Sequence, residues 1–196
     1  MQAIESQTLI LYHTDLGGHW PEEGGSALAA RLPYLKRLAL AKGGAAARAS
    51  IAGIALALRA LAGLLGRPVA VSELEFAPDA KPCLASGVAV DFSIAHSGSL
   101  VGCAALRGGK VGFDLECGTD RRLNDWVARE ATVKACGAGM RAVNEVTLTP
   151  GGAMCRGVLW HARVLDAFPG ATACLVTSSK VATVQLRALP LADLFS

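Results

Sequence analysis

The spacing of apolar residues divides the chain into helical and extended stretches that follow one another in a repeated order. A period of about 3.6 residues predicts helices over residues 26–40, 45–65 and 125–136. Short alternating or continuous apolar runs predict strands over residues 8–12, 71–76, 88–94, 100–106, 111–116, 145–148, 158–165, 171–177 and 181–188. A short helix is the alternative for residues 162–165. This mixture of helices and strands predicts an α+β fold.

The ends of the predicted helices carry capping residues. We expect Ser26 to cap the first helix and Asn124 the third, because a side-chain oxygen there accepts a hydrogen bond from a free backbone N–H. Gly66 and Gly137 follow the second and third helices, where glycine adopts the left-handed conformation that ends a helix. A Gly-Gly pair separates the first two helices.

The order of helix, glycine, strand and two further strands occurs twice. Residues 48–106 and 129–177 follow it in parallel, with a cysteine at the matching place in each. Matching orders of elements indicate an internal repeat. The sequence therefore predicts two similar α+β halves, residues 1–107 and 108–196, with a ligand-binding cleft between them.

Charge and hydropathy narrow the classes of partner. The 196-residue chain has a net charge of +3, which suits acidic small ligands or an acidic partner protein and is too small to indicate nucleic-acid binding. Residues 49–58 form the most apolar stretch, which Arg59 follows, and this stretch is too short to span a membrane. We therefore expect neither nucleic acid nor a membrane as a partner.

The cysteines show no metal-binding or redox motif. They are Cys83, Cys103, Cys117, Cys136, Cys155 and Cys174, without a C-x-x-C pair or zinc-like spacing. Most lie in apolar surroundings and are expected to be buried, which favours a reducing compartment, although an even number leaves disulfides open. Residues 1–7 lack the basic region and apolar run of a signal peptide. We expect a cytoplasmic protein.

The strand predicted at residues 111–116 carries two acids in alternation with apolar residues. Asp114 and Glu116 are two apart, so both point to one face, about 7 Å apart along the strand. Paired carboxylates of this kind suit Mg²⁺, which binds one or two protein carboxylates together with water and substrate phosphates. The alternative is a solvated strand end with two ordinary acids.

A third acid lies on the following helix together with a lysine. Glu130 and Lys134 are four apart and share a helix face. An ordinary surface ion pair is the alternative. Because the helix begins shortly after Glu116, Glu130 is able to reach the strand acids as a third metal ligand or as a base, with Lys134 facing the anion that the metal holds.

Other polar side chains are candidates for binding phosphate. His96 precedes a turn that begins at Ser97 and offers hydroxyl and backbone N–H groups to an anion. Arg48 is the favoured phosphate-binding arginine of the long helix, whereas Arg59 reads as a surface residue. The His13–His19 segment is better explained as a polar loop after an edge strand than as a metal site.

Cationic and acidic residues around one cleft are typical of phosphoryl-type transfer, which needs charge neutralisation and positioning. The chain contains no G-x-x-x-x-G-K-[ST] motif, which excludes a P-loop NTPase. It also lacks a G-x-S-x-G motif and the kinase signature set.

Four sequence blocks, in this order, resemble the 4′-phosphopantetheinyl transferases of the surfactin-synthetase-activating (Sfp) type. The blocks are Lys81-Pro82, F-S-I-A-H-S at 92–97, V-G-F-D-L-E at 111–116, and W-x-x-R-E-A-x-x-K at 126–134. They lie within residues 48–139, and the termini match only in general character.

The resemblance implies two halves related by a pseudo-two-fold axis, with the active site in the cleft between them, in a pseudo-dimeric monomer. It implies transfer of 4′-phosphopantetheine from coenzyme A to a serine of an apo acyl or peptidyl carrier protein. The reaction uses Mg²⁺ and releases adenosine 3′,5′-bisphosphate. The pathway that the carrier serves stays open.

The resemblance also assigns roles to residues of this chain. Asp114, Glu116 and Glu130 would hold Mg²⁺, and Glu130 would also be placed to accept the serine proton. Lys134 would meet the pyrophosphate. The nucleotide and its phosphates would be held by Arg48, Lys81 and His96, with Lys36 and Arg37 as weaker candidates.

Three departures from the family pattern bear on these expectations. Ala95 stands where the family has serine, and Arg129 stands where it has lysine. The segment between Glu116 and the helix is short, and its two arginines, Arg121 and Arg122, are expected to steer an acidic carrier protein. The alternatives are a catalytically inactive coenzyme A-binding or interaction protein of the same fold, and another Mg²⁺-dependent nucleotide transferase.

Overall fold

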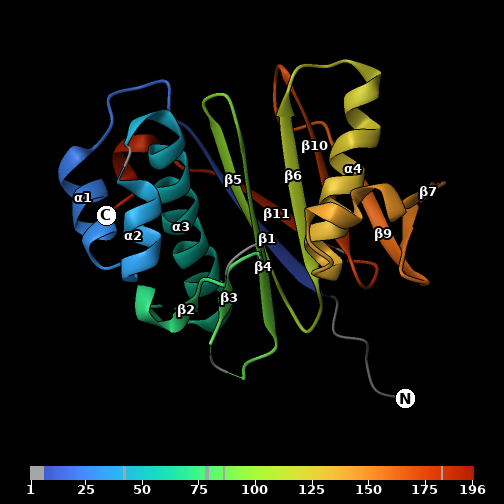
Figure 1. Cartoon of the computed structure of the whole chain (residues 1–196), viewed down its shortest axis with the longest axis horizontal. Coiled ribbons are helices and arrows are strands. Elements are labelled where there is room, and N and C mark those ends of the chain that lie inside the picture. Colours follow the sequence, from blue (N-terminus) through green and yellow to red (C-terminus); the bar gives the residue numbers. More distant parts are fainter. Residues whose placement is uncertain (1–6, 42, 78–79, 86, 182) are drawn as a thin grey trace.

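Two β-sheets form the centre of the protein, and one long helix covers the outer face of each. The computed structural model describes residues 7–196 except 42, 78–79, 86 and 182. Helix α3 (Gly44–Leu65) lies on one flank and helix α4 (Arg121–Cys136) on the other, with the strands between them (Figure 1). The predicted α+β class is confirmed.

The first sheet combines strands from both ends of the chain. Its spatial order is β11 (Thr183–Ala188), β1 (Thr8–Asp15), β5 (Leu100–Arg107) and β4 (Val90–Ser97). The β11–β1 pair is parallel, and the other pairs are antiparallel. Helices α1 (Glu22–Ala30) and α2 (Tyr34–Leu40) lie on the same flank as α3 (Figure 1).

The second sheet is antiparallel and comes from the later part of the chain. Its spatial order is β6 (Val111–Cys117), β10 (Ala171–Thr177), β9 (Val158–Leu165), β8 (Gly152–Cys155) and β7 (Thr147–Thr149). A small two-stranded sheet pairs β2 (Leu74–Glu75) with β3 (Cys83–Leu84). Single 3₁₀ turns occur at η1 (Val71–Glu73), η2 (Met140–Glu145) and η3 (Leu191–Asp193).

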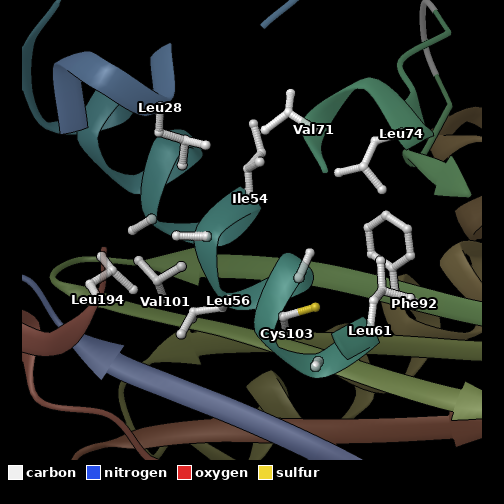
Figure 2. Close-up of a cluster of buried hydrophobic side chains, with 14 of the residues drawn as sticks. Leu28, Ile54, Leu56, Leu61, Val71, Leu74, Phe92, Val101, Cys103 and Leu194 are labelled. Atoms are coloured by element: carbon white, nitrogen blue, oxygen red, sulfur yellow. The ribbon is translucent and has the colours of Figure 1, made fainter. Parts of the chain in front are cut away.

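Three hydrophobic clusters alternate with the two sheets. The first lies between α3 and the first sheet and includes Leu56 and Phe92 (Figure 2). The second includes Leu11 of β1 and Phe113 of β6 and therefore lies between the sheets. The third joins α4 to the second sheet through residues such as Val127. The buried layers thus fix the order helix, sheet, sheet, helix.

Strands β4 and β6 run beside each other but are joined by side chains. The backbone N–H groups of β6 donate to β4 side chains: Val111 to Asp91 Oδ2 at 2.8 Å, Phe113 to Ser93 Oγ at 3.0 Å and Cys117 to Ser97 Oγ at 3.1 Å. These three bonds, here called the β4–β6 seam, satisfy backbone donors that would otherwise be orphaned at a sheet edge. Ala95 supplies no hydroxyl at the remaining alternate position.

A glycine lets α4 approach the second sheet closely. A Cβ atom at Gly112 would lie 1.8 Å from the backbone oxygen of Ala131, a distance that atoms cannot adopt. The absence of a side chain at Gly112 therefore sets how deeply α4 sits on β6. The apolar alternation of β6 buries Val111, Phe113 and Leu115 on the other side of the strand from this contact.

Several predicted elements agree with the structure. The helix predicted at 45–65 is α3, and Gly66 ends it in the left-handed conformation with φ 68°. Gly137 ends α4 in the same way. The stretch 162–165 belongs to strand β9, which decides between the two alternatives. The long apolar helix α3 meets the length and composition of a membrane span, yet over half of its most apolar window is buried within the fold.

The prediction of one helix over 26–40 is wrong. The structure has α1 and α2 there, and Ser26 lies inside α1 instead of capping it. Pro33 separates the helices because it lacks an N–H and disfavours helical geometry at the residue before it.

The predicted cap at Asn124 is also wrong. Asp120 is the N-cap, and its carboxylate accepts a hydrogen bond from the backbone N–H of Arg122 at 2.9 Å. Arg121 and Arg122 therefore lie in the first turn of α4 and not in a loop. The polar residues of this turn carry no apolar period, which is why the pattern missed it.

Other differences concern short elements. The strand predicted at 71–76 is η1 followed by β2, and the strand predicted at 145–148 begins only at Thr147, after η2. Strands β3 and β8 were not predicted. Most of the cysteines were expected to be buried: Cys103, Cys155 and Cys174 are buried and Cys136 is partly buried, whereas Cys83 and Cys117 are exposed.

The predicted boundary at 107/108 falls between β5 and β6, which belong to different sheets. The end of the chain returns to the first half, because β11 pairs with β1 and Leu194 packs in the first cluster. The first sheet is therefore built from both predicted segments.

Replacing Gly112 with alanine is expected to destabilise the protein by about 1–3 kcal/mol or more, because two backbone segments must separate to admit the methyl group. Urea denaturation measures this change. Gly87→Ala is the matched control, because a Cβ there meets no atom within 4 Å, and its effect should stay within about 0.5 kcal/mol. Equal denaturation midpoints for the two variants would contradict the close approach of α4.

Candidate active site between the two sheets

Asp114 is the buried acid of the site. Its side chain projects from β6 beneath α4, and its Oδ1 accepts a hydrogen bond from Lys134 Nζ at 2.5 Å. The other oxygen, Oδ2, is buried without a hydrogen-bond partner in the described structure. Burial raises the pKa of Asp114 to about 6, against the opposing effect of Lys134. A buried anionic oxygen without a partner is costly unless a ligand or cation meets it.

Glu130 faces the same lysine from the preceding turn of α4. Its Oε2 lies 4.0 Å from Lys134 Nζ. Burial raises the pKa of Glu130, and the nearby Glu116 raises it further. An elevated pKa makes a carboxylate a stronger proton acceptor than an ordinary surface glutamate.

Glu116 links the acids to strand β4. Its Oε2 accepts a hydrogen bond from Ser97 Oγ at 2.6 Å, and the same hydroxyl accepts the N–H of Cys117. The negative charge of Glu116 helps to raise the pKa of both Asp114 and Glu130. The structure therefore brings the three predicted acids within electrostatic reach of one another, while the Ser97 hydroxyl is engaged within the protein.

His96 lies at the end of β4, beside this group. Burial lowers the pKa of His96, and the positive charge of Lys134 lowers it further, with a smaller contribution from Lys36 of α2. Glu116 acts in the opposite direction. The pKa of the His96 imidazole is therefore influenced by Glu116, by Lys134 of α4 and by Lys36 of α2.

Lys81 is anchored at the start of the β4–β6 seam. Its Nζ donates to Asp91 Oδ2 at 2.6 Å and to the Val111 carbonyl at 2.7 Å. Burial lowers the pKa of Lys81, and the charge of Asp91 partly offsets this effect. The family resemblance assigns Lys81 to the nucleotide phosphates. In the structure Lys81 also neutralises Asp91, whose carboxylate would otherwise be buried without an opposite charge.

A cavity of about 480 Å³ opens beside these residues. Three lysines line it: Lys81, Lys110 and Lys134. Pro82, Ile94 and other residues complete its wall. Asp91 also lines the cavity and pairs with Lys81, and Lys134 pairs with Asp114. The three lysines outnumber this one lining acid, which suits an anionic ligand, and the size of the cavity lies within the range of small-molecule sites.

Arg48 lies with a different group of residues. Its guanidinium pairs with Glu22 of α1 at 2.6 Å and lies 5.8 Å from the centre of the Trp20 ring. It is not among the residues that line the lysine cavity. Its assignment to the nucleotide stays a prediction.

Sequence reasoning missed two contributors to the site. Lys110 lines the cavity, and Asp91 holds Lys81 and the first β6 donor. Arg129, which the sequence analysis noted, donates to the Val146 carbonyl. Lys110 directly precedes the acidic strand, and its position in the turn was the available signal. Asp91 alternates with Ser93 and Ser97, a pattern that only the neighbouring strand explains.

The donor chemistry of the site fits Mg²⁺. The ion prefers carboxylate oxygens, and Asp114 Oδ2 is an anionic oxygen that lacks a partner. In the part of the chain that the structure describes, no three His, Cys, Asp or Glu side chains are already gathered as metal ligands. Asp114, Glu116 and Glu130 are the acids that would hold the ion, and the Lys134 ammonium now lies 2.5 Å from Asp114 and 4.0 Å from Glu130.

The arrangement combines three acids and a histidine with the three lysines that line the cavity. It is able to bind a polyanion, hold a divalent cation and accept a proton. A scan against protein-family models and a search of curated proteins each found no match to this chain. The resemblance to the phosphopantetheinyl transferases therefore rests on the four sequence blocks alone.

The pKa of Asp114 predicts how stability depends on pH when chelator removes divalent cations. Its pKa is about 6 in the folded protein and 3.8 in a free side chain, so the contribution of Asp114 to stability is fully present below about pH 4 and is lost as the pH rises through about 6. From about pH 3.5 to 7.5, the stability of the wild type relative to Asp114→Asn should fall by about 2–3 kcal/mol.

Urea denaturation across this pH range, in chelator, measures the difference. Asp166→Asn removes an exposed carboxylate of the same type and serves as the control. Parallel pH profiles for the wild type and Asp114→Asn would show that Asp114 is not a buried, raised-pKa acid.

Proposed function

We propose that this protein transfers 4′-phosphopantetheine from coenzyme A to a serine of an apo acyl or peptidyl carrier protein, with Mg²⁺, and releases adenosine 3′,5′-bisphosphate. One observation carries the proposal. The residues of separate sequence blocks, Asp114, Lys134 and His96, lie within electrostatic reach of one another beside a lysine-lined cavity. The proposed enzyme is a holo-acyl-carrier-protein synthase of the Sfp type.

The order of strands supports a pseudo-two-fold relation between the halves. In the first half, α3 packs against β5, which lies between β1 and β4. In the second, α4 packs against both β6 and β10, and β10 lies between β6 and β9. We propose that the two halves are related in this way and that the active site occupies the cleft along the β4–β6 seam, in a monomer.

Coenzyme A is proposed to place its phosphates over the lysine cavity. Lys134 and Lys110 supply free or exchangeable positive charge, and Lys81 supplies charge at the cavity wall. His96 and the turn after Ser97 are proposed to contact the nucleotide phosphates. Arg48 is kept as a nucleotide-binding proposal on sequence grounds. Charge-assisted contacts to phosphate are the strong hydrogen bonds of such a site.

The reaction transfers a phosphoryl group to an alcohol. The serine oxygen forms a bond to the phosphorus of the pantetheine phosphate, the bond from that phosphorus to the bridging oxygen breaks, and adenosine 3′,5′-bisphosphate leaves. Glu130, whose pKa is raised, accepts the serine proton. Asp114, Glu116 and Glu130 would hold Mg²⁺, which neutralises charge on the pyrophosphate. Lys134 stabilises the same charge once it turns from Asp114 to the phosphate.

A specific contact favours a second candidate function. The ion pair between Lys134 and Asp114 already neutralises the buried acid, as expected of an inactive protein that binds coenzyme A without metal. The partnerless Asp114 Oδ2 and the raised pKa of Glu130 favour the active enzyme instead. We propose a cytoplasmic location for either function, without nucleic-acid or membrane partners.

Transfer itself tests the function. The protein is incubated with coenzyme A, Mg²⁺ and a panel of apo carrier proteins, and intact-mass spectrometry measures each carrier. A mass gain of one phosphopantetheine on the carrier serine is expected, and it should disappear in chelator. Coenzyme A binding without any mass gain would support the inactive alternative.

Glu116→Gln is expected to lower the turnover number by about 10²-fold or more, because it removes charge that acts on the reacting group, while coenzyme A binding is largely kept. Steady-state kinetics with a carrier substrate measure the change. Glu75→Gln is the control, since Glu75 is an exposed acid of β2. Full activity of Glu116→Gln would remove Glu116 from the metal site.

His96 is expected to make coenzyme A binding depend on pH. Its pKa is lowered in the free protein, and a bound phosphate favours the charged imidazole, so binding takes up a proton and affinity rises as the pH falls toward 6. His96→Ala should flatten this rise and cost roughly 1.5–3 kcal/mol at the acidic end. Calorimetry of wild type, His96→Ala and the exposed control His19→Ala measures it. An unchanged pH profile in His96→Ala would exclude the contact.

A further inference from the structure

Two cysteine side chains meet where helix α4 ends against strand β8. The Sγ atoms of Cys136 and Cys155 lie 3.2 Å apart, although the residues are 19 positions apart in the sequence. Both are free thiols. Because the S–S distance of a disulfide bond is about 2 Å, the two sulfur atoms need to approach each other by only about 1 Å to form one.

The surrounding backbone holds both thiols in place. Cys136 is the last residue of α4. Cys155 is the last residue of β8 and pairs with Val158 of β9. The two residues between them, Arg156 and Gly157, both have positive φ angles, which is the geometry of a tight two-residue hairpin turn. The end of a helix and the end of a hairpin strand therefore bring the two sulfur atoms together.

The two thiols differ in exposure, which sets the order in which they react. Cys155 is 1% exposed and belongs to the third hydrophobic cluster, whereas Cys136 packs against this cluster and is partly exposed. Burial raises the pKa of Cys155 to about 11, so Cys155 keeps its proton at neutral pH. An oxidant from solution therefore reaches the Cys136 sulfur first, and Cys155 reacts second.

The other buried cysteines have different partners. Cys103 of β5 and Cys174 of β10 each donate a weak hydrogen bond from Sγ to the backbone carbonyl of the following residue. In the part of the chain that the structure describes, no other pair of cysteine sulfurs is in hydrogen-bond contact. The contact between Cys136 and Cys155 is therefore a particular feature of the place where α4 meets β8.

We propose that Cys136 and Cys155 form a reversible, peroxide-sensitive disulfide that fastens the end of α4 to β8. Hydrogen peroxide first oxidises the Cys136 thiol to a sulfenic acid, as the O–O bond breaks and one water leaves. The Cys155 sulfur then forms a bond to the Cys136 sulfur, and the hydroxyl of the sulfenic acid leaves with the Cys155 proton as a second water. The two electrons that the sulfur atoms lose reduce the peroxide.

The disulfide would act on the helix that carries two residues of the candidate active site. Glu130 and Lys134 belong to α4, and Lys134 lies two positions before Cys136. Fastening the last turn of α4 would therefore fix the turn from which Lys134 reaches Asp114. A reducing compartment keeps the two thiols open until an oxidant arrives, as is usual for redox-sensing cysteines inside cells.

Intact-mass spectrometry tests the proposal in a Cys83→Ser/Cys117→Ser background, which removes the two exposed thiols. After treatment with hydrogen peroxide, the protein should lose the mass of two hydrogen atoms, and a digest should contain a peptide linked through Cys136 and Cys155. Dithiothreitol should reverse the loss. Cys136→Ser and Cys155→Ser, each added to this background, are the controls and should show no loss. Cys136 is partly exposed, so its variant is expected to fold.

Thermal unfolding measures the fastening of α4. In the same background, the oxidised protein should unfold about 5 °C or more above the reduced protein, because a disulfide that closes this loop restricts the unfolded chain. The added Cys136→Ser variant should unfold at the same temperature before and after treatment with peroxide.

Two outcomes would overturn the inference. Oxygen added to Cys136 without loss of hydrogen, or a disulfide that joins either cysteine to Cys103 or Cys174, would show that the pair does not close. A linked peptide without a rise in Tm would show that the bond does not fasten α4. Neither measurement uses coenzyme A or a carrier protein, so both outcomes are independent of the proposed transfer reaction.

Discussion

Three hydrogen bonds along the β4–β6 seam hold the two sheets beside each other, and the candidate site depends on them. Val111, Phe113 and Cys117 donate their backbone N–H groups to side chains of β4 instead of to its backbone. These bonds to side chains keep β4 and β6 adjacent without the backbone pairing that would make the two sheets continuous. The first of these bonds also needs Lys81, which neutralises the buried carboxylate of Asp91. The β4–β6 seam thus joins the two sheets at one edge of the core that they share.

The seam positions the candidate site because side chains from both of its strands meet near its last hydrogen bond, at Cys117. Ser97 accepts this bond and also holds Glu116, while His96 lies next to it. On the other side, the close contact at Gly112 brings α4 down until Lys134 meets Asp114. Burial then raises the pKa of Asp114 and Glu130. The packing of the two sheets and α4 therefore places two acids with raised pKa values side by side.

The sequence predicted the parts of this account that depend on local pattern. Alternation placed Asp114 and Glu116 on one strand, and helical spacing placed Glu130 with Lys134. The sequence could not show that Ser97 would bind Glu116 or that Asp91 would hold Lys81, because these contacts join residues 19 and 10 positions apart in different segments of the fold. Asp120 escaped notice as a cap because the first turn of α4 is polar and shows no apolar period.

The central claim is that the β6 acids and Lys134 form one site for a divalent cation and the coenzyme A pyrophosphate. Manganese in place of magnesium tests it directly, because paramagnetic resonance detects phosphorus that lies close to the ion. With wild-type protein, Mn²⁺ and coenzyme A, we predict a ³¹P hyperfine coupling that Asp114→Ala abolishes. A bound manganese signal without phosphorus coupling, or the same coupling in Asp114→Ala, would contradict the account.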